Sequence, residues 1–368
     1  MSNLILSLVA FLTLLTVLIV EKLVLRRRRK RMKIVVQVNG TRGKSETVRL
    51  IHGVLSGNGY RVLAKTTGTV PLWIMPDGSH REIKRRGPAN IQEQYRALKQ
   101  AGRLKCDALV VECMAIRPEM QLASGKILDA DLTVITNAYP DHIEEIGASE
   151  EATAGVLSLS VPGNRKCLVG NLGEGALEMM RTHCERVGSE LLRAGERTIS
   201  DEGMAFRPHP DNLRLIDRVI EVFGLNEKAS MEGMARVLPD VGTFRYLKLK
   251  LNSGSAILAN AFAANDIRST IYLLERTVAD FPGRRVVGFF NSRDDRPDRA
   301  LVFEPFTRKF GNLMIRGSIP VHKFKGLKYR KVKDGESIEE FLQKGDIVFG
   351  FGNIRGLVQW LSNLEVIE

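Results

Sequence analysis

The sequence predicts an α/β protein with two soluble domains behind one membrane-spanning helix. Strand and helix patterns alternate from about residue 33, a turn-forming stretch interrupts them at 239–245, and the N-terminus is uncharged and apolar. The 368 residues exceed one typical domain, and 44% apolar content is enough for substantial cores. We expect an anchor over 1–31, a central domain over 32–242 and a smaller C-terminal α/β domain over 243–368.

The N-terminal apolar segment has the features of a membrane anchor. It runs without charge from Leu4 to Val20, and six consecutive cations follow at 26–31. About 20 apolar residues cross a bilayer as a helix, and a cleavable signal would carry its positive charge before the apolar run. The positive-inside rule then places the remaining chain in the cytoplasm, as a single-pass protein of the cell membrane.

The central domain shows the pattern of a parallel sheet covered by helices. Buried parallel strands are predicted from short apolar runs at 34–38, 108–111, 132–135 and 167–169. Helical spacing of apolar residues predicts helices at 44–57, 90–101, 116–128, 212–223 and 228–237.

The C-terminal domain repeats this pattern on a smaller scale. Strands are predicted near 246–251, 256–261, 285–290, 312–315 and 346–351, and helices at 268–279, 336–343 and 355–364. Ligands of open α/β sheets bind outside the carboxyl ends of the strands. We therefore expect chemistry in the loops at 39–45, 112–118, 137–142, 264–270 and 291–299.

A glycine-bracketed phosphate loop follows the first predicted strand and opens a helix. It reads Asn39-Gly40-Thr41-Arg42-Gly43-Lys44-Ser45, in which the glycines let backbone N–H groups point at phosphate oxygens. Lys44 would neutralise the outer phosphates, and Ser45 can bind Mg²⁺. Val38 stands where the usual motif has its first glycine, so this is a shortened variant. It predicts that the chain binds a nucleoside triphosphate.

Polar residues end two further predicted strands. Glu112 follows the run 108–111, where a phosphate-loop protein needs a carboxylate for Mg²⁺, although it could instead cap the helix at 116–128. Asn137, Asp141 and His142 follow the strand at 132–135 and could bind a second metal and orient substrate. Asp141 could equally be a helix N-cap, and His142 a surface residue.

Charge and cysteine content limit the partners. The formal net charge is +13, which suits an anionic partner, whereas 6% aromatic residues and no recognition motif argue against nucleic acid. The four cysteines include no C-x-x-C pair, so reduced thiols are expected.

These motifs together resemble the Mur ligase superfamily, the ATP-dependent amide ligases that include folylpolyglutamate synthase. A larger set of motifs looks like the family of poly-γ-glutamate synthase catalytic subunits, CapB or PgsB. The set comprises the phosphate loop, Lys65 to Thr69 (Lys-Thr-Thr-Gly-Thr), Glu112 to Ala115, Ala263 to Asp266 and Gly352 to Ile354. The resemblance implies a Mur-ligase-like fold with a Rossmann-like C-terminal domain.

The resemblance also implies roles for individual residues. Gly40, Thr41, Arg42, Gly43 and Lys44 would bind ATP; Ser45 and Glu112 would bind one Mg²⁺, and His142 a second. Lys44, Glu112, His142 and Arg245 would be the catalytic set, Arg245 approaching the γ-phosphate. Asn212 resembles an adenine-side residue, and Asn265, Asp266 and Arg296 would complete the nucleotide site. Thr67, Gly68, Thr69, Asn137 and Asp141 would contact substrate.

Two features depart from the superfamily pattern. No lysine can be assigned to the place of the carbamylated lysine that bridges the metals in many Mur ligases, and the second domain is shorter than usual. The binding site for the incoming amino acid could therefore differ.

The resemblance implies an acid–amino-acid ligase that polymerises glutamate through γ-carboxyl linkages by way of an acyl phosphate. Its cofactors would be ATP and Mg²⁺, and its partners glutamate, the poly-γ-glutamate chain and other membrane subunits of a capsule synthesis and export complex. Two alternatives remain: a ligase adding glutamate to a folate-like acceptor, and a membrane-tethered phosphate-loop ATPase or kinase of a capsule export system. A soluble folate acceptor gives no reason for a membrane anchor.

Overall fold

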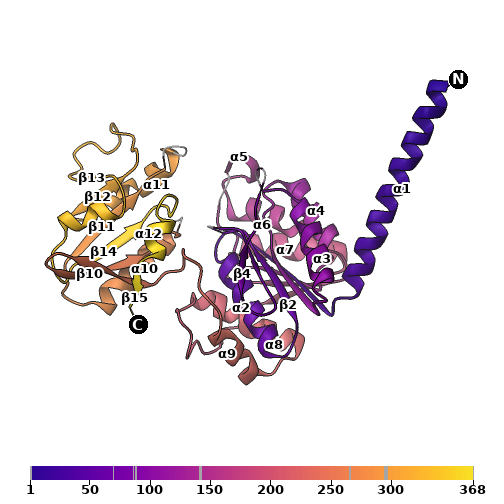
Figure 1. Cartoon of the computed structure of the whole chain (residues 1–368), viewed down its shortest axis with the longest axis horizontal. Coiled ribbons are helices and arrows are strands. Elements are labelled where there is room, and N and C mark those ends of the chain that lie inside the picture. The colour runs from indigo at the N-terminus through magenta and orange to yellow at the C-terminus, as the bar shows by residue number, and fades with distance from the viewer. Residues whose placement is uncertain are drawn as a thin grey trace. The chain divides into compact units, whose positions relative to one another are not determined.

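The computed structural model describes residues 2–68, 70–85, 87, 89–140, 143–264, 267–293 and 297–367. The chain divides into two compact units, Met1–Leu238 and Pro239–Glu368. Each unit is built around its own sheet (Figure 1). The boundary expected after residue 242 lies just beyond this division, within the turn-forming stretch at 239–245.

Unit 1 contains an eight-stranded sheet in the order β4-β3-β2-β5-β1-β6-β7-β8. Strands β2, β5, β1, β6, β7 and β8 are parallel to one another, while β3 and β4 form an antiparallel edge beside β2. The four predicted central strands are confirmed as β1, β5, β6 and β7. The bounds are β1 Ile34–Asn39, β2 Val62–Thr66, β3 Leu72–Ile74, β4 His80–Glu82, β5 Ala108–Glu112, β6 Leu132–Ile135, β7 Lys166–Val169 and β8 Glu190–Arg193.

Helices cover both faces of this sheet. Successive residues of β1 enter different cores: Val36 packs with α2 and α8 on one face, and Val35 packs with α3 on the other. A separate apolar cluster joins β6 and β7 to α6 and α7. The bounds are α2 Lys44–Gly57, α3 Gln92–Arg103, α4 Pro118–Leu128, α5 Ile143–Ile146, α6 Glu150–Ser158, α7 Glu174–Val187, α8 Pro210–Phe223 and α9 Glu227–Ala235. Because helices cover both faces of the sheet, the sequences of its central strands are nearly continuous apolar runs.

Helix α1, Ser2–Lys30, precedes the sheet, and its last turns contact α3 and the segment that follows α4. Its segment Leu4–Lys30 is long and apolar enough to cross a membrane, and its most apolar window is unburied. At the other end, Leu25 packs on the core cluster that contains Ala97 and Leu98 of α3. The buried Arg29 donates to the carbonyl oxygens of Leu128 and Asp129 and pairs with Asp131 at 2.6 Å. One helix therefore continues from the exposed apolar segment into the core of unit 1.

Unit 2 contains a seven-stranded sheet in the order β13-β12-β11-β14-β10-β9-β15. Its strands are β9 Tyr246–Leu251, β10 Gly254–Asn260, β11 Val286–Asn291, β12 Leu313–Arg316, β13 Arg330–Val332, β14 Ile347–Phe351 and β15 Glu365–Val366. Its helices are α10 Ile267–Asp280, α11 Pro297–Thr307, the 3₁₀ helix η1 Glu336–Phe341 and α12 Val358–Ser362. The five predicted strands and the helix at 268–279 are confirmed, whereas the predicted last helix is much shorter than 355–364.

Helix α11 was not predicted, because Pro305 lies within it and proline disfavours a helix interior. The helix forms because it buries aromatic side chains. Phe303 and Phe306 are each 2% exposed and contact Phe351 of β14. Tertiary burial of two rings thus outweighs the local cost of the proline.

The buried His52 makes the stability of unit 1 sensitive to acid. His52 lies in α2 with its Nε2 atom 3.2 Å from the Met75 carbonyl oxygen, and burial lowers its pKa from 6.5 to about 4. Between these pH values the unfolded chain binds the proton and the folded chain does not, so stability is full above pH 6.5 and falls as the pH drops towards 4. His52 should contribute a loss of about 2 kcal/mol between pH 7 and pH 5.

The measurement is urea denaturation of the full chain in detergent at pH 7 and pH 5. The His52→Gln variant should lose less stability between the two pH values than the unsubstituted chain. Equal losses would mean that other groups cause the acid sensitivity.

Candidate active site

Parallel pairing brings the predicted catalytic segments to one edge of the unit 1 sheet. Strand β1 lies between β5 and β6, with Val38 opposite Glu112 and Asn39 opposite Ile135. The phosphate loop, Glu112 and the segment after Ile135 therefore leave the sheet side by side at its carboxyl edge. This is the edge at which ligands bind in open α/β sheets.

The two glycines of the phosphate loop are required by conformation and by crowding. Gly40 has φ +123° and Gly43 has φ +79°, which side-chain-bearing residues rarely adopt. A Cβ atom on Gly40 would lie 2.1 Å from Thr136 Oγ1, and one on Gly43 would lie 2.7 Å from Asn212 Oδ1. The loop then enters α2 at Lys44, so its backbone N–H groups lie at a helix N-terminus, where anions bind.

Lys44 bonds to the loop backbone, and Ser45 bonds to Glu112. Lys44 Nζ donates to the carbonyl oxygens of Gly40 and Thr41 at 2.6 and 3.2 Å, so the amine lies over the loop. Glu112 is 3% exposed, and its Oε2 atom accepts hydrogen bonds from Ser45 Oγ at 2.8 Å and from the Thr67 N–H at 2.7 Å. A hydroxyl and a carboxylate at this spacing are oxygen donors of the kind that Mg²⁺ prefers.

The segment after β6 holds the phosphate loop in shape. Asn137 Oδ1 accepts from the Arg42 N–H at 2.9 Å, and its Nδ2 donates to the Arg42 carbonyl oxygen at 3.2 Å. Thr136 Oγ1 donates to the same carbonyl oxygen at 2.6 Å. Asn137 therefore contacts the loop backbone through both ends of its amide. The predicted site residues Asp141 and His142 lie outside the described residues, as does Thr69.

Asn212 lies against the end of the phosphate loop. Its Nδ2 atom donates to Glu46 Oε1 at 2.6 Å, and the same oxygen accepts from the His209 N–H at 2.9 Å. Glu46 in the first turn of α2 thus fixes the start of α8 beside Gly43. The structure brings Asn212 to the predicted nucleotide site, and its adenine contact stays a prediction.

A buried polar network beneath the loop was not predicted. Asn39 Nδ2 donates to Gln121 Oε1 at 2.8 Å and to Ser160 Oγ at 3.0 Å, while Asn39 Oδ1 accepts from the Gly40 N–H. Gln121 Nε2 donates in turn to the Ala115 carbonyl oxygen. Asn39 therefore connects the first glycine of the loop to α4. The available signal was the pair of polar amides, Gln37 and Asn39, in a mainly apolar strand.

A buried ion cluster lies near Glu112, at the end of β2. Lys65 is fully buried with its Nζ atom 3.0 Å from Glu93 Oε2, and Arg85 Nε lies 2.7 Å from Glu93 Oε1. Burial lowers the pKa of Lys65, and the negative charges of Glu93 and Glu112 oppose this shift. Burial favours the neutral acid of Glu93, but its bonds and ion pairs with Arg85 and Lys65 lower its pKa overall. Two cations therefore stabilise a buried carboxylate next to the segment that carries Thr67 and Gly68.

In unit 2, polar groups gather at the carboxyl ends of β11 and β14. Asn291 Oδ1 accepts from Arg316 Nη1 at 2.9 Å, and its Nδ2 donates to the Asn353 carbonyl oxygen. A small pocket adjoins this pair, lined by Phe290, Asn291, Ser292, Arg293, Ala300, Phe303, Gly352 and Asn353. Polar residues thus gather at the predicted loop beginning at 291.

Arg245 directly precedes β9 in unit 2 and is half-buried. Burial lowers its pKa, and Asp240 opposes this shift. Its Nε atom has no hydrogen-bond partner within the described ranges. The predicted nucleotide residues Asn265, Asp266 and Arg296 lie outside those ranges.

The fold is shared with folylpolyglutamate synthases. The structure of the bifunctional folylpolyglutamate synthase/dihydrofolate synthase from Yersinia pestis matches with a TM-score of 0.71 and 16% sequence identity, covering 92% of this chain and 90% of that one. The Mycobacterium tuberculosis folylpolyglutamate synthase, solved with ADP, matches with a TM-score of 0.66 and 16% identity, covering 92% of each chain. The chain therefore has the Mur-ligase-like fold.

Sequence comparison gives the family. The capsule biosynthesis protein CapB of Bacillus anthracis is 30% identical over 93% of this chain and 78% of its own length. The PGA synthase CapB of Bacillus subtilis is 29% identical over 96% of this chain and 95% of its own length. A family model of the poly-γ-glutamate synthase CapB C-terminal domain matches residues 246–365. The chain belongs to the poly-γ-glutamate synthase CapB family.

The packing around Gly40 gives a test of the loop. Gly40→Ala places a methyl group against Thr136 in a backbone conformation that strains alanine by about 1–3 kcal/mol. Relief of that strain displaces the loop, so binding of a fluorescent ATP analogue to the full chain should weaken roughly tenfold or more. Gly59→Ala is the matched control, because Gly59 has φ +82° with nothing within 4 Å of the added atom. Equal affinities of the two variants for the ATP analogue would show that the loop does not bind the nucleotide.

Proposed function

We propose that this chain is an ATP-dependent ligase that joins glutamate units through their γ-carboxyl groups. One observation carries the proposal: in a chain of the CapB family, Lys44, Ser45 and Glu112 meet at one edge of a Mur-ligase-like sheet. A solved neighbour of the same fold is described with Mn, AMPPNP and L-glutamate bound. A nucleotide-activated carboxylate and an amino acid amine are the reactants that this combination supports.

The reaction has two steps. A γ-carboxylate oxygen attacks the γ-phosphorus of ATP, the bond to the β–γ bridging oxygen breaks, and ADP leaves with that electron pair. The amine of the next glutamate attacks the acyl carbon, the carbon–oxygen bond to phosphate breaks, and the amine loses a proton to solvent. The acyl phosphate is needed because a free carboxylate has no adequate leaving group.

This chain's residues would act mainly by binding and charge stabilisation. The loop N–H groups and Lys44 would hold the phosphates and stabilise charge on the transferred phosphoryl group. Asn137, Thr136 and Asn39 would keep those donors in place, since each is bonded to the loop. Lys65 and Glu93 would support the Thr67 segment, which we assign with Gly68, Thr69, Asn137 and Asp141 to substrate binding.

Ser45 and Glu112 fit a magnesium ion. Both offer oxygen atoms on the side of the loop where the phosphates would lie. No group of three or more His, Cys, Asp or Glu residues that could hold a metal occurs among the described residues, so phosphate oxygens and water would supply the remaining ligands. When bound, the ion supplies charge neutralisation at the phosphates. His142, Arg245, Asn265, Asp266 and Arg296 keep the metal or nucleotide roles that the family resemblance assigns to them.

We also propose that α1 spans the cell membrane once and leaves both units in the cytoplasm, where ATP is available. Six cations at 26–31 follow the apolar segment, as the positive-inside rule requires for a cytoplasmic end. Such an anchor supports assembly with other membrane subunits that pass the polymer outward.

Turnover with and without glutamate tests the ligase function. Full-length protein in membranes is supplied with ATP, Mg²⁺ and labelled glutamate, and phosphate release is compared with products identified by mass spectrometry. A ligase should release phosphate only with glutamate and form γ-linked oligomers. Glutamate-independent phosphate release without an amide product would indicate an ATPase of an export system, and addition only to a folate acceptor would indicate the related folate ligase.

Two substitutions test the assigned residues. Lys44→Ala removes the cation over the loop, and Glu112→Ala removes the buried carboxylate, so each should reduce glutamate-dependent phosphate release by roughly a hundredfold or more. The exposed Lys228→Ala and Glu185→Ala variants are matched controls and should keep normal rates. Circular dichroism and membrane recovery establish that the variants fold and insert. Normal polymer synthesis by either site variant would show that the site assignment is wrong.

A further inference from the structure

The outer faces of α3 and α4 carry an unusual combination of exposed side chains. The exposed charged residues of this α3–α4 face are five cations, Arg96, Lys99, Arg103, Arg117 and Lys126, and one anion, Glu119. Three large apolar side chains lie among them: Tyr95 is 36% exposed, Met120 38% and Leu122 42%. Residues 96, 99 and 103 share one stripe of α3, and 119, 122 and 126 share one stripe of α4.

The five cations of this face outnumber its single carboxylate, Glu119. Within the described part of the chain, none of the five forms an ion pair. Helices α8 and α9 differ, since the exposed charged residues within them and at the C-cap of α9 are Glu221, Glu227, Glu232, Lys228 and Arg236. Helix α7 exposes Glu174, Glu178, Glu185, Arg181 and Arg186. The excess of positive charge is therefore greater on the α3–α4 face than on α7, α8 and α9.

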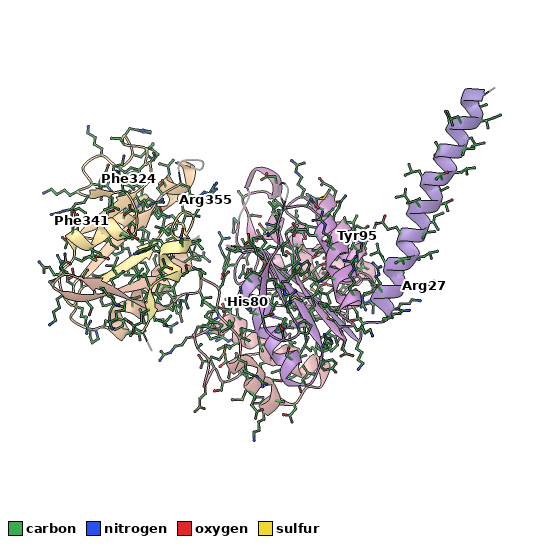
Figure 2. All side chains as sticks on the ribbon, viewed as in Figure 1. Arg27, His80, Tyr95, Phe324, Phe341 and Arg355 are labelled. Carbon is green, nitrogen blue, oxygen red and sulfur yellow. The ribbon has the colours of Figure 1, made fainter. Side chains whose placement is uncertain are left out.

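The α3–α4 face adjoins the point at which α1 leaves unit 1. Leu25 packs on the cluster beneath α3, and a Cβ atom added to Gly102 of α3 would lie 3.6 Å from the Arg28 side chain. Arg29 donates to the backbone at the end of α4, at Leu128. In Figures 1 and 2, α3, α4 and Tyr95 lie on the side of unit 1 that carries α1 and Arg27. The surface is thus held beside the membrane segment by buried contacts.

We propose that the α3–α4 face lies on the anionic lipid surface of the leaflet from which α1 emerges. Lysine and arginine side chains are attracted to anionic headgroups, and tyrosine and aliphatic side chains enter the boundary between headgroups and acyl chains. The anchor raises the effective concentration of this face at the bilayer, so weak contacts suffice. Apolar side chains among the cations favour a lipid surface over the anionic polymer, which offers little apolar area to cover them.

A fluorescent label on this face tests the proposal. The full-length Leu122→Cys variant carries a polarity-sensitive dye, and the four native cysteines are buried, so labelling is selective. The protein is placed in nanodiscs of phosphatidylcholine alone or mixed with phosphatidylglycerol. With anionic lipid, the dye should shift to shorter emission wavelengths and become protected from iodide quenching, and high salt should reverse both changes.

Met179→Cys in α7 is the matched control, because Met179 is 44% exposed and lies on a helix of mixed charge. Its dye should respond to neither lipid. In the Leu122→Cys background, Arg96→Glu, Lys99→Glu and Lys126→Glu together should abolish the response, since each removed cation weakens contact about fivefold. Reversing three exposed cations elsewhere, Arg181→Glu, Arg186→Glu and Lys228→Glu, should leave it intact.

Three outcomes overturn the proposal. They are no response at position 122 to anionic lipid, equal responses at 122 and 179, and a response at 122 only when poly-γ-glutamate is added. The last outcome would identify a polymer-binding surface instead. Recovery of the protein in nanodiscs reports insertion of α1 separately, and no step requires catalysis, so these outcomes are distinguishable from failure of the proposed ligase activity.

Discussion

The parallel pairing of β1 with β5 and β6 is the constraint on which the rest of the structure depends. Its register sets Val38 opposite Glu112, so the phosphate loop and the carboxylate emerge together. A shift of one residue would turn the side chains of β1 to the opposite faces and separate Ser45 from Glu112. Burial on both faces of the sheet opposes such a shift, because Val35 and Val36 belong to different cores. Packing of apolar side chains thus determines the geometry of the polar site.

The parts of this site that could be predicted are those in which local pattern and function coincide. Four apolar runs indicated the central strands, and the phosphate loop and Glu112 stand at strand ends in the sequence itself. The supporting contacts join residues distant along the chain, as Asn39 with Ser160 and Lys65 with Glu93 do, and no local pattern relates them. Helix α11 was missed for the related reason that burial of Phe303 and Phe306 outweighs the effect of Pro305. Local propensity predicts most helices and strands. Tertiary contacts decide where a helix forms against its propensity and which distant residues support the site.

Helix α1 and the phosphate loop are connected through Asp131 and strand β1. Asp131 pairs with Arg29 of α1 through one carboxylate oxygen and accepts from the Val35 N–H through the other at 2.8 Å. Arg165 also lies 3.0 Å from Asp131, so two cations hold this carboxylate at the start of β6. Asp131 therefore links helix α1 to the strand that ends in the phosphate loop. Buried contacts thus hold the last turns of α1 against unit 1.

In the proposed membrane arrangement, the α3–α4 layer separates the bilayer from a site that binds anions. A helix layer is about 10 Å thick and contains no mobile ions, so the negative potential of the leaflet is only weakly screened across it. That residual potential would oppose binding of ATP, glutamate and a polyanionic chain. The cations of the α3–α4 face and of residues 26–31 lie next to the lipid headgroups in this arrangement. Their positive charge compensates the negative potential of the leaflet there. The basic surface thus both attaches the unit to lipid and protects an anion site from the lipid's charge.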